Sequence, residues 1–280
     1  MLDKITIFYN PRKQEAALKA KRLEAALIAL GTKVKVHETK ADSNDWGVLD
    51  LDTKLAIALG GDGTLLLASK QVLKHDIPLL GVNFGHLGFL SEYGDIEMEE
   101  LAKEVFNNQI YIEDRSLLNA QVPSLNINLY ALNDIVVNRS LTSNLLYSDL
   151  FIDNNLLHSF RSDGIVICTP TGSTAYALSA GGAVMDPHIK AFQIVPIAAH
   201  SLNSRAHVVS DEQEIVLVSK DSTNPFYIQA DGQELIELKP GSRIVVQKAE
   251  YSLKLAKLKS KDRNFYSILR DKMKWGSVVN

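Results

Sequence analysis

Short apolar runs recur along the first 110 residues, and polar or turn-forming residues bound each of them. The runs have the length and the branched apolar content of β-strands. They are KITIFY (4–9), KVKVHE (33–38), LAIALG (55–60) and IPLLGVNF (77–84). The pattern therefore predicts four strands in this part of the chain.

Longer segments with a helical period separate these runs. Between residues 16 and 30, apolar residues recur every three or four positions, with Lys and Glu between them, and Gly31 follows. This spacing predicts an amphipathic helix that ends at the glycine. Residues 65–75 and 96–109 show similar helical spacing. Strands that alternate with helices in this way predict a parallel sheet covered by helices on both faces.

The pattern changes after about residue 110, where the apolar runs become short and several alternate with polar residues. Hairpin-type turns are expected at Asn154-Asn155 and Asp231-Gly232. Such a series of strands predicts an all-β domain, and a sandwich is the expected form. The fold class is thus α/β plus all-β. We expect an α/β nucleotide-binding domain over residues 1–110, joined by the tail 264–280, and a β-sandwich over 111–263.

Composition narrows the class of function. The chain carries 30 Lys and Arg against 33 Asp and Glu, a net charge of −3, which argues against a nucleic-acid partner bound through bulk charge. The single cysteine, Cys168, cannot form an intramolecular disulfide and fits a reducing compartment. The uncharged stretch 164–185 is too rich in Gly, Ser and Thr to enter a membrane, and no signal-peptide-like run opens the chain. A soluble, cytoplasmic protein without a membrane partner is expected.

A carboxylate stands between glycines where the third predicted strand gives way to a helix, in GGDGT (60–64). Ligands of open parallel sheets collect at the carboxyl ends of strands, and a helix N-terminus suits phosphate. The segment is neither a P-loop nor a complete G-x-G-x-x-G motif. Two interpretations stay open. Asp62 either caps the helix in an ordinary turn or accepts the proton of a hydroxyl that attacks a phosphate.

A second glycine- and hydroxyl-rich stretch follows a predicted strand, FRSDGIVICTPTGSTAYALSAGGAVMDP (160–187). Its hydroxyl residues are Thr169, Thr171, Ser173, Thr174, Tyr176 and Ser179. Hydroxyl and backbone N–H groups in this density suit a ligand rich in oxygen, such as a ribose or a diphosphate. A plain polar turn would explain a few of these residues, but it does not easily explain the cluster.

These motifs together resemble those of the NAD kinases. In chain order they are GGDGT (60–64), GHLGFL (85–90), ALND (131–134), DGIVICTPTGSTAY (163–176), GG (181–182) and ADGQ (230–233). GGDGT is shared with lipid kinases and phosphofructokinases, whereas TPTGSTAY downstream of it makes the match specific. The resemblance covers essentially the whole chain. It implies transfer of the γ-phosphate of ATP to the 2′-hydroxyl of the adenosine ribose of NAD, which gives NADP.

The resemblance also implies the residues of the site. Asp62 would be the proton acceptor, and the ATP phosphates would lie against Gly60, Gly61, Gly63 and Thr64. The implied NAD contacts are Asp62, Gly63, His86, Phe89, Asn133, Asp134, Arg161, Asp163, Thr174, Ala175, Tyr176, Ala177, Leu178, Ser179, Ala198 and Gln233. Most family members have Glu where this chain has Asp134, so the carboxylate here is one methylene shorter.

A divalent metal ion, Mg²⁺ or Mn²⁺, is expected to accompany ATP, because ATP carries a concentrated negative charge. The sequence shows no metal-binding spacing of its own, so the ion is expected to arrive with the nucleotide. The partners implied are NAD, ATP and further copies of the chain in a homodimer or homotetramer. Three alternatives remain: a diacylglycerol-type lipid kinase, a phosphofructokinase and a non-catalytic NAD sensor. A lipid kinase should have a basic amphipathic stretch, which does not stand out here. The intact Asp62 speaks against a sensor.

Overall fold

The computed structural model describes residues 2–39, 49–85, 88–91, 96–140, 145–201, 203–221, 223–233, 235–261 and 264–274. The chain forms two compact units. The first unit comprises residues 1–114 and 251–280, and the second comprises residues 115–250. The predicted combination of an α/β part with an all-β part is confirmed.

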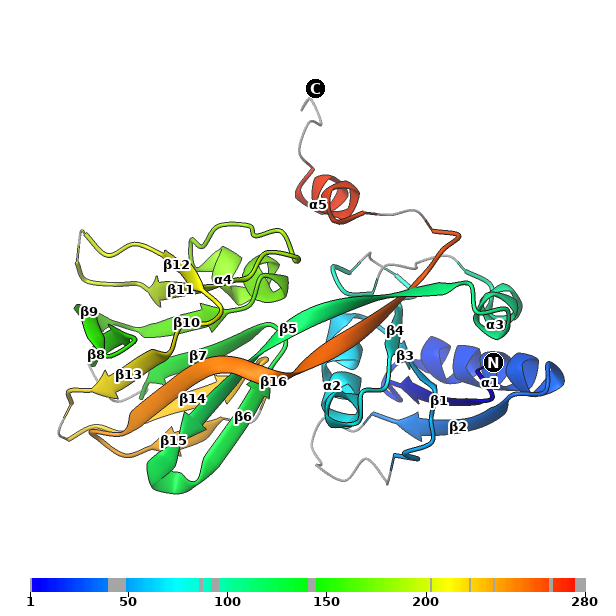
Figure 1. The fold of residues 1–280 in the computed structure, drawn as a ribbon, viewed down its shortest axis with the longest axis horizontal. Coiled ribbons are helices and arrows are strands. Elements are labelled where there is room, and N and C mark those ends of the chain that lie inside the picture. Colours follow the sequence, from blue (N-terminus) through cyan, green and yellow to red (C-terminus); the bar gives the residue numbers. More distant parts are fainter. Residues whose placement is uncertain are drawn as a thin grey trace. The chain divides into compact units, whose positions relative to one another are not determined.

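The first unit is built on a parallel sheet (Figure 1). Its strands are β1 (Lys4–Tyr9), β2 (Lys33–Glu38), β3 (Leu55–Leu59), β4 (Leu79–Val82) and the end of β16 (Arg243–Leu258). They lie in the order β2-β1-β3-β4-β16, and each neighbouring pair is parallel. The helical segments are α1 (Gln14–Ala29), α2 (Asp62–Val72), η1 (Leu73–His75), α3 (Met98–Phe106) and α5 (Phe265–Met273).

Helices cover both faces of this sheet, as the sequence predicts. Alternate strand residues, such as Ile7 and Ile57, share one core with Leu23 of α1 and Leu101 of α3. On the other face, a Cβ added to Gly81 of β4 would lie 2.4 Å from Leu65 Cδ1 of α2. Helices α1 and α3 therefore pack on one face and α2 on the other. Of the five apolar residues whose spacing predicts the inward face, Leu30 at the C-cap is half-buried, and four are fully buried: Ala16, Ala20, Leu23 and Leu27.

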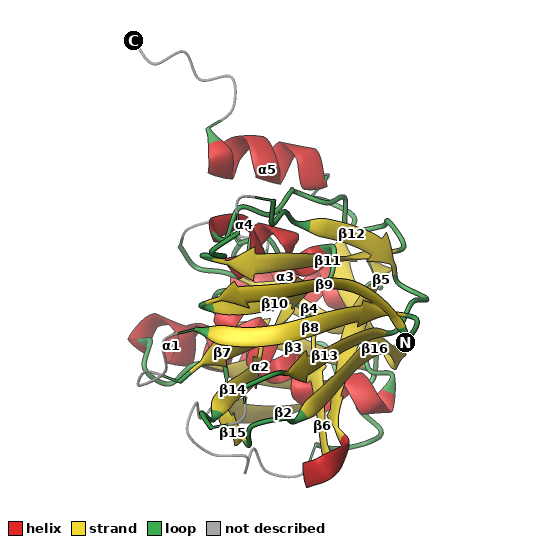
Figure 2. Ribbon diagram, turned by 90° about the vertical axis from the view of Figure 1, so that its left-hand side faces the viewer, coloured by secondary structure: helices red, strands yellow, loops and turns green. Residues whose placement is uncertain are grey.

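The second unit is a β-sandwich, which confirms the prediction (Figure 2). One sheet has the order β12-β11-β10-β7-β14-β15, with every pair antiparallel. These strands are β7 (Asp134–Arg139), β10 (Gly164–Cys168), β11 (Ala191–Ile197), β12 (His207–Ser210), β14 (Phe226–Ala230) and β15 (Ile236–Leu238). The helical segments η3 (Thr171–Thr174) and α4 (Tyr176–Ser179) follow β10.

The opposing sheet of the sandwich is also antiparallel within this unit. Its strands are β5 (Ile110–Val122), β6 (Ile127–Ala131), β8 (Leu146–Ile152), β9 (Asn155–Ser162), β13 (Ile215–Ser219) and the first half of β16, with η2 (Pro123–Leu125) between β5 and β6. Leu150 and Leu217 from this sheet and Ile165 and Ile228 from the other share one buried core. The two sheets thus pack face to face.

Three details differ from the expectations based on the sequence. Residues 111–114 belong to the first unit. Residues 251–263 belong to the first unit, because the end of β16 pairs with β4 through Leu255 and Leu79. The first hairpin turn lies at Asp153-Asn154, where φ is 47° and 66°, and Asn155 already begins β9. The second turn lies at Asp231-Gly232, as predicted, with φ of 52° and 64°.

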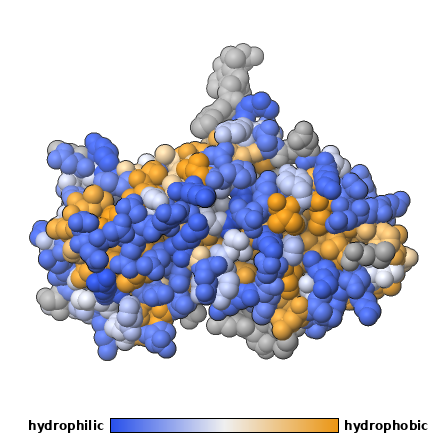
Figure 3. All heavy atoms as spheres, in the orientation of Figure 1, coloured by the Kyte–Doolittle hydropathy of each residue, from blue (hydrophilic) through white to orange (hydrophobic). Residues whose placement is uncertain are grey.

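On the face drawn in Figure 3, apolar residues lie in small groups among hydrophilic ones, as is usual for a globular domain. Among the described residues, no helix combines the length and the apolar content needed to span a bilayer.

Candidate functional site

The GGDGT segment connects β3 to α2 at the carboxyl edge of the first sheet. Gly60 has φ of +154°, and a Cβ there would lie 2.3 Å from Thr64 Oγ1, so the turn requires glycine. Gly61 is the N-cap of α2, and its carbonyl accepts from the N–H groups of Thr64 and Leu65. The N–H groups of Asp62 and Gly63 have no recorded acceptor among the described residues. They are therefore open to a ligand, as the first N–H groups of a helix are.

The carboxylate of Asp62 does not cap this helix, so the interpretation as an ordinary cap is wrong. It accepts four hydrogen bonds from the segment that follows β4. The N–H of Phe89 donates to Oδ2 at 2.8 Å, and the N–H groups of Leu90 and Ser91 donate to Oδ1 at 3.3 and 3.0 Å. The Ser91 hydroxyl donates to Oδ1 at 2.6 Å. Because β3 and β4 are neighbours, the loops at their carboxyl ends meet at Asp62.

The segment around Phe89 is shaped to reach this carboxylate. A Cβ on Gly88 would lie 2.0 Å from Asp62 Oδ1, so glycine is needed for the approach. The ammonium of Lys272 lies over the ring of Phe89, 4.5 Å from the ring centroid, in a cation–π contact. His86, the other residue proposed from this motif, lies outside the described residues.

A pocket of about 390 Å³ adjoins the turn within the first unit. It is lined by Lys13, Glu15, Ala16, Gly61, Asn83, Phe84 and Gly85. A Cβ on Gly61 would lie 3.9 Å from Lys13 Nζ, so this ammonium stands beside the N-terminus of α2. Within the described residues no carboxylate is recorded as a partner of Lys13, whereas Glu15 pairs with Lys19 at 2.9 Å.

Lys13 is a candidate that sequence reasoning missed. The available signal was its position just after the first strand, in NPRK (10–13). Because β1 lies beside β3, residues that follow these two strands meet at one edge of the sheet. The strand order, which the sequence did not give, was needed to place Lys13 at the turn.

In the second unit, three of the sequence motifs converge. Asp231 of ADGQ accepts from the backbone N–H groups of Leu132, Asn133 and Asp134 at 2.9, 2.7 and 3.2 Å. One carboxylate thus holds the whole ALND turn. Gln233, the residue proposed from the same motif, follows this turn, and its N–H donates to the carbonyl of Ala230.

TPTGSTAY packs closely against the ALND turn from its other side. The N–H of Thr169 donates to the carbonyl of Asn133 at 2.9 Å, and its hydroxyl donates to the carbonyl of Leu132 at 2.5 Å. A Cβ on Gly172 would lie 2.0 Å from the carbonyl oxygen of Asn133. The glycine of this motif is therefore required for backbone contact between the two turns.

The hydroxyl cluster divides into a buried part and an accessible part, and the three hydroxyl residues expected to contact NAD, Thr174, Tyr176 and Ser179, belong to the accessible part. Ser173, like Thr169, is fully buried, and its hydroxyl donates to the carbonyl of Pro170 at 2.7 Å. Thr174 is half-buried, whereas Tyr176 and Ser179 are exposed. The buried hydroxyls of Thr169 and Ser173 thus stabilise the turn itself, because they donate to backbone carbonyls within it and beside it.

The remaining residues of this segment are placed by the short helix α4. Ala175 precedes it, and Leu178 is half-buried within it. The side chain of Ala177 is fully buried in a small core with Val166 and Val195, so only its backbone is available to a ligand.

Asp134 begins β7 and is 4% exposed. Burial, followed by the nearby charge of Asp231, raises the pKa of Asp134 to about 7. Its strand neighbour is Cys168, and burial together with the charge of Asp134 raises the pKa of this thiol to about 12. Burial therefore favours the protonated form of Asp134, which can donate a hydrogen bond as well as accept one.

Arg161 and Asp163 do not pair with each other. Asp163 accepts from Arg139 Nε at 2.6 Å, while the guanidinium of Arg161 lies 5.0 Å from the ring centroid of Tyr147. Arg139 is thus a second residue that the sequence analysis missed. Ala198 follows β11 and has a positive φ of 46°, a conformation that side-chain-bearing residues rarely adopt.

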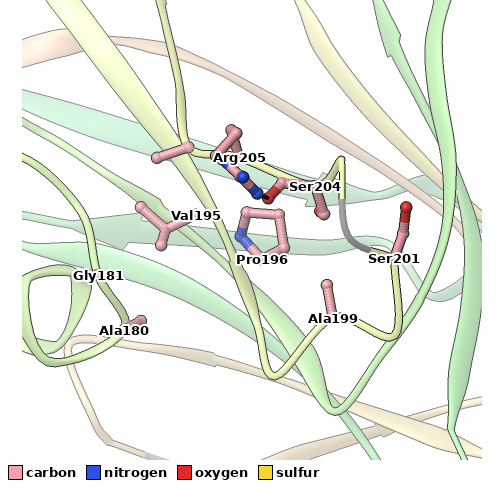
Figure 4. Close-up of a pocket in the computed structure, with 9 residues that line it drawn as sticks. Ala180, Gly181, Val195, Pro196, Ala199, Ser201, Ser204 and Arg205 are labelled. Carbon is pink, nitrogen blue, oxygen red and sulfur yellow. Dashed lines mark hydrogen bonds between the residues drawn. The ribbon is translucent and has the colours of Figure 1, made fainter.

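A further pocket of the second unit, about 410 Å³, lies between the end of α4 and the chain that follows β11 (Figure 4). It is lined by Ala180, Gly181, Val195, Pro196, Ala199, Ser201, Ser204, Arg205 and Ala206. Figure 4 shows the Ser204 and Arg205 side chains close to each other beside Pro196. None of the sequence-predicted site residues lines this pocket.

No group of three or more His, Cys, Asp or Glu residues that could hold a metal ion is found among the described residues. This does not conflict with Mg²⁺, which usually takes one or two carboxylates and completes its shell with phosphates and water. In the GGDGT turn the available carboxylate is that of Asp62.

The fold and the site define a class of protein: a nucleotide-dependent kinase in which a glycine turn with one carboxylate precedes a helix. Two family models match the chain, the ATP-NAD kinase N-terminal domain over residues 5–110 and the ATP-NAD kinase C-terminal domain over residues 132–258. The chain belongs to the NAD kinase family.

Curated relatives agree with these matches. The NAD kinase of Carboxydothermus hydrogenoformans is 40% identical over 223 residues, which covers 79% of each chain. The NAD kinase of Legionella pneumophila (strain Corby) is 38% identical over 257 residues, which covers 90% of this chain and 83% of the relative. The alternatives of a lipid kinase, a phosphofructokinase or a non-catalytic sensor gain no support from these relatives.

Solved structures show the same fold. An NAD kinase from Archaeoglobus fulgidus in complex with ATP aligns with a TM-score of 0.76 at 27% identity and covers 95% of this chain and 98% of that one. Yeast NADH kinase complexed with NADH shares the fold, with a TM-score of 0.86 at 24% identity over 100% of this chain and 89% of that one.

Proposed function

We infer that this enzyme is an NAD kinase that transfers the γ-phosphate of ATP to the 2′-hydroxyl of the adenosine ribose of NAD. One observation carries the chemistry. Four hydrogen bonds fix a single carboxylate, that of Asp62, at the N-terminus of α2. The backbone N–H groups of Asp62 and Gly63 at the same N-terminus are available to a ligand. Positioning and charge neutralisation supply most of the catalysis in phosphoryl transfer, and this turn offers both.

We propose that the ATP phosphates lie against the open N–H groups of Asp62 and Gly63, with Gly60, Gly61 and Thr64 shaping the turn. Lys13 adds a positive charge beside this N-terminus, which favours a polyanion further. Asp62 takes the proton of the attacking hydroxyl. A divalent ion, Mg²⁺ or Mn²⁺, would be held by the phosphates and would supply charge neutralisation.

We propose that NAD is bound by the turns that Asp231 and Thr169 hold together. The accessible polar groups there are those of Asn133, Thr174 and Tyr176. The buried carboxyl of Asp134, at the start of β7, is proposed as a further contact. Further contacts are proposed for Gly63, His86, Phe89, Arg161, Asp163, Ala175, Ala177, Leu178, Ser179, Ala198 and Gln233. For Ala177 the contact would come from the backbone, because its methyl group is buried.

Further copies of this chain are the proposed protein partner, in a homodimer or homotetramer. Strand β9 supports this, since among the described strands it is recorded as paired with β8 alone, and it exposes Leu156 and Leu157 by 57% and 43%. Light scattering on the purified protein would give the oligomeric state. The proposed location is the cytoplasm, and the buried, free thiol of Cys168 supports a reducing compartment.

The direct test is incubation of the purified protein with ATP, Mg²⁺ and NAD, with NADP read by an NADP-specific dehydrogenase. Asp62→Asn should lower the rate by about 10²–10⁴-fold, the usual contribution of a positioned base. Wild-type protein that forms no NADP, or that phosphorylates diacylglycerol instead, would refute the proposed function.

A further inference from the structure

The two oxygens of the Asp62 carboxylate receive different numbers of hydrogen bonds. Oδ1 accepts three, from the N–H groups of Leu90 and Ser91 and from the Ser91 hydroxyl. Oδ2 accepts one among the described residues, from the N–H of Phe89. Since a carboxylate oxygen has about two lone-pair directions, Oδ1 is fully occupied and Oδ2 keeps one direction open.

We propose that Ser91 is a positioning residue, which occupies Oδ1 and so leaves Oδ2 as the atom that receives the proton from the 2′-hydroxyl of NAD. This inference rests on the proposed function. In the step, the O–H bond of the ribose breaks and its proton moves to Oδ2. The ribose oxygen forms a bond to the γ-phosphorus, and the bond from that phosphorus to the β–γ bridging oxygen breaks. ADP leaves with the electron pair.

The surroundings of Ser91 show how closely it is fitted to this place. Its side chain is fully buried, and the 2.6 Å distance to Oδ1 is typical of a hydroxyl that donates to an ionised carboxylate. A Cβ on Gly88 would lie 2.5 Å from Ser91 Oγ, and one on Gly81 would lie 3.2 Å from Ser91 Cα. Glycines on both sides therefore give Ser91 the space to reach the carboxylate.

The Ser91 hydroxyl is the one side-chain donor among the four hydrogen bonds to the Asp62 carboxylate, so a substitution can remove it without altering the backbone. Without it, the two remaining donors to Oδ1 are backbone N–H groups, and one of them is at 3.3 Å. A looser carboxylate lowers the fraction of bound substrate in a reactive geometry, and it leaves the binding of either substrate unchanged. The expected effect is therefore on kcat.

The test uses Ser91→Ala, which removes the donor, and Ser91→Cys, which keeps a slightly larger group at the same place that donates only weakly. Ser69→Ala is the matched control. Ser69 is another buried serine, on α2, and its hydroxyl donates to the carbonyl of Leu66 at 2.9 Å. Both Ser91 variants should lose about tenfold in kcat, with KM for ATP and for NAD within twofold of wild type. Ser69→Ala should keep the wild-type kcat.

Wild-type kcat in both Ser91 variants would overturn the inference. So would a joint change of kcat and both KM values with a lowered Tm, because that result marks a structural role. If Ser91→Ala does not fold, Ser91→Cys carries the test alone. Failure of the proposed function would be seen separately, as a wild-type protein that forms no NADP.

Discussion

Asp134 offers the sharpest test of the electrostatics of the second unit. The residue is 4% exposed, and burial with the charge of Asp231 raises its pKa from 3.8 to about 7. Asp134→Asn keeps the size of the side chain but cannot ionise. We expect this variant to be more stable than wild type at pH 8, and we expect the advantage to disappear as the pH falls.

The sign follows from proton linkage. Below pH 3.8 Asp134 is protonated in both the folded and the unfolded chain. Its ionisation therefore adds nothing to the difference in stability between wild type and Asp134→Asn. Between pH 3.8 and about 7 the unfolded chain releases the proton and the folded chain keeps it, so the stability of wild type falls as pH rises. The rise of the pKa from 3.8 to about 7 corresponds to a loss of about 4 kcal/mol in the free energy of unfolding above pH 7. For a unit of this size, that is on the order of 10 °C in Tm.

The assay is thermal denaturation of wild type and Asp134→Asn at intervals from pH 4 to pH 8. Asp221→Asn serves as the control, since the N–H of Thr223 and the groups of Asn224 lower the pKa of Asp221 to about 2. Asp221 is ionised in both the folded and the unfolded chain above pH 5. The difference in Tm between Asp221→Asn and wild type should therefore stay constant from pH 5 to pH 8. A difference for Asp134→Asn that is equally flat across the whole range would refute the reasoning.

Three further predictions concern the substrates. Lys13→Gln should raise KM for ATP by roughly fivefold and leave KM for NAD unchanged, while Lys21→Gln on the exposed side of α1 changes neither. In the same steady-state assay, Tyr176→Ala should raise KM for NAD by roughly tenfold, and an equal rise for ATP would remove Tyr176 from the NAD site. Gly172→Ala places a methyl group against the carbonyl of Asn133, so Tm should fall by on the order of 5 °C or more, and an unchanged Tm would contradict the close contact.

The elements with strong periodicity were predictable from the sequence. The inward positions of α1 follow from the spacing of Ala16, Ala20, Leu23 and Leu27, because a helix must bury its apolar stripe against the sheet. Strand–helix alternation likewise predicted the parallel sheet. Periodicity does not give strand order, however, so it could not show that β1 neighbours β3 or that Lys13 reaches the GGDGT turn.

Long-range polar contacts were also beyond the sequence pattern. Asp231 holds the turn at Asn133 across nearly a hundred residues of chain, and nothing in its neighbourhood marks that distant partner. The roles within the hydroxyl cluster depend on packing in the same way. Residue type cannot separate Ser173, which bonds the backbone inside the turn, from Tyr176, which is exposed. Burial makes that distinction, and burial depends on the packing of the whole unit.

The four donors around Asp62 explain why an acid, and no amide, suits this position. An asparagine side chain has one acceptor oxygen and one NH₂ group, which is a donor. In either orientation the NH₂ group would face another donor, either the N–H of Phe89 or the N–H and hydroxyl of Ser91. Asp62→Asn therefore removes a base and also strains the loop that positions it. Loss of activity in that variant alone cannot separate the two effects. The Ser91 variants separate them, because they alter how the carboxylate is held while the base itself remains.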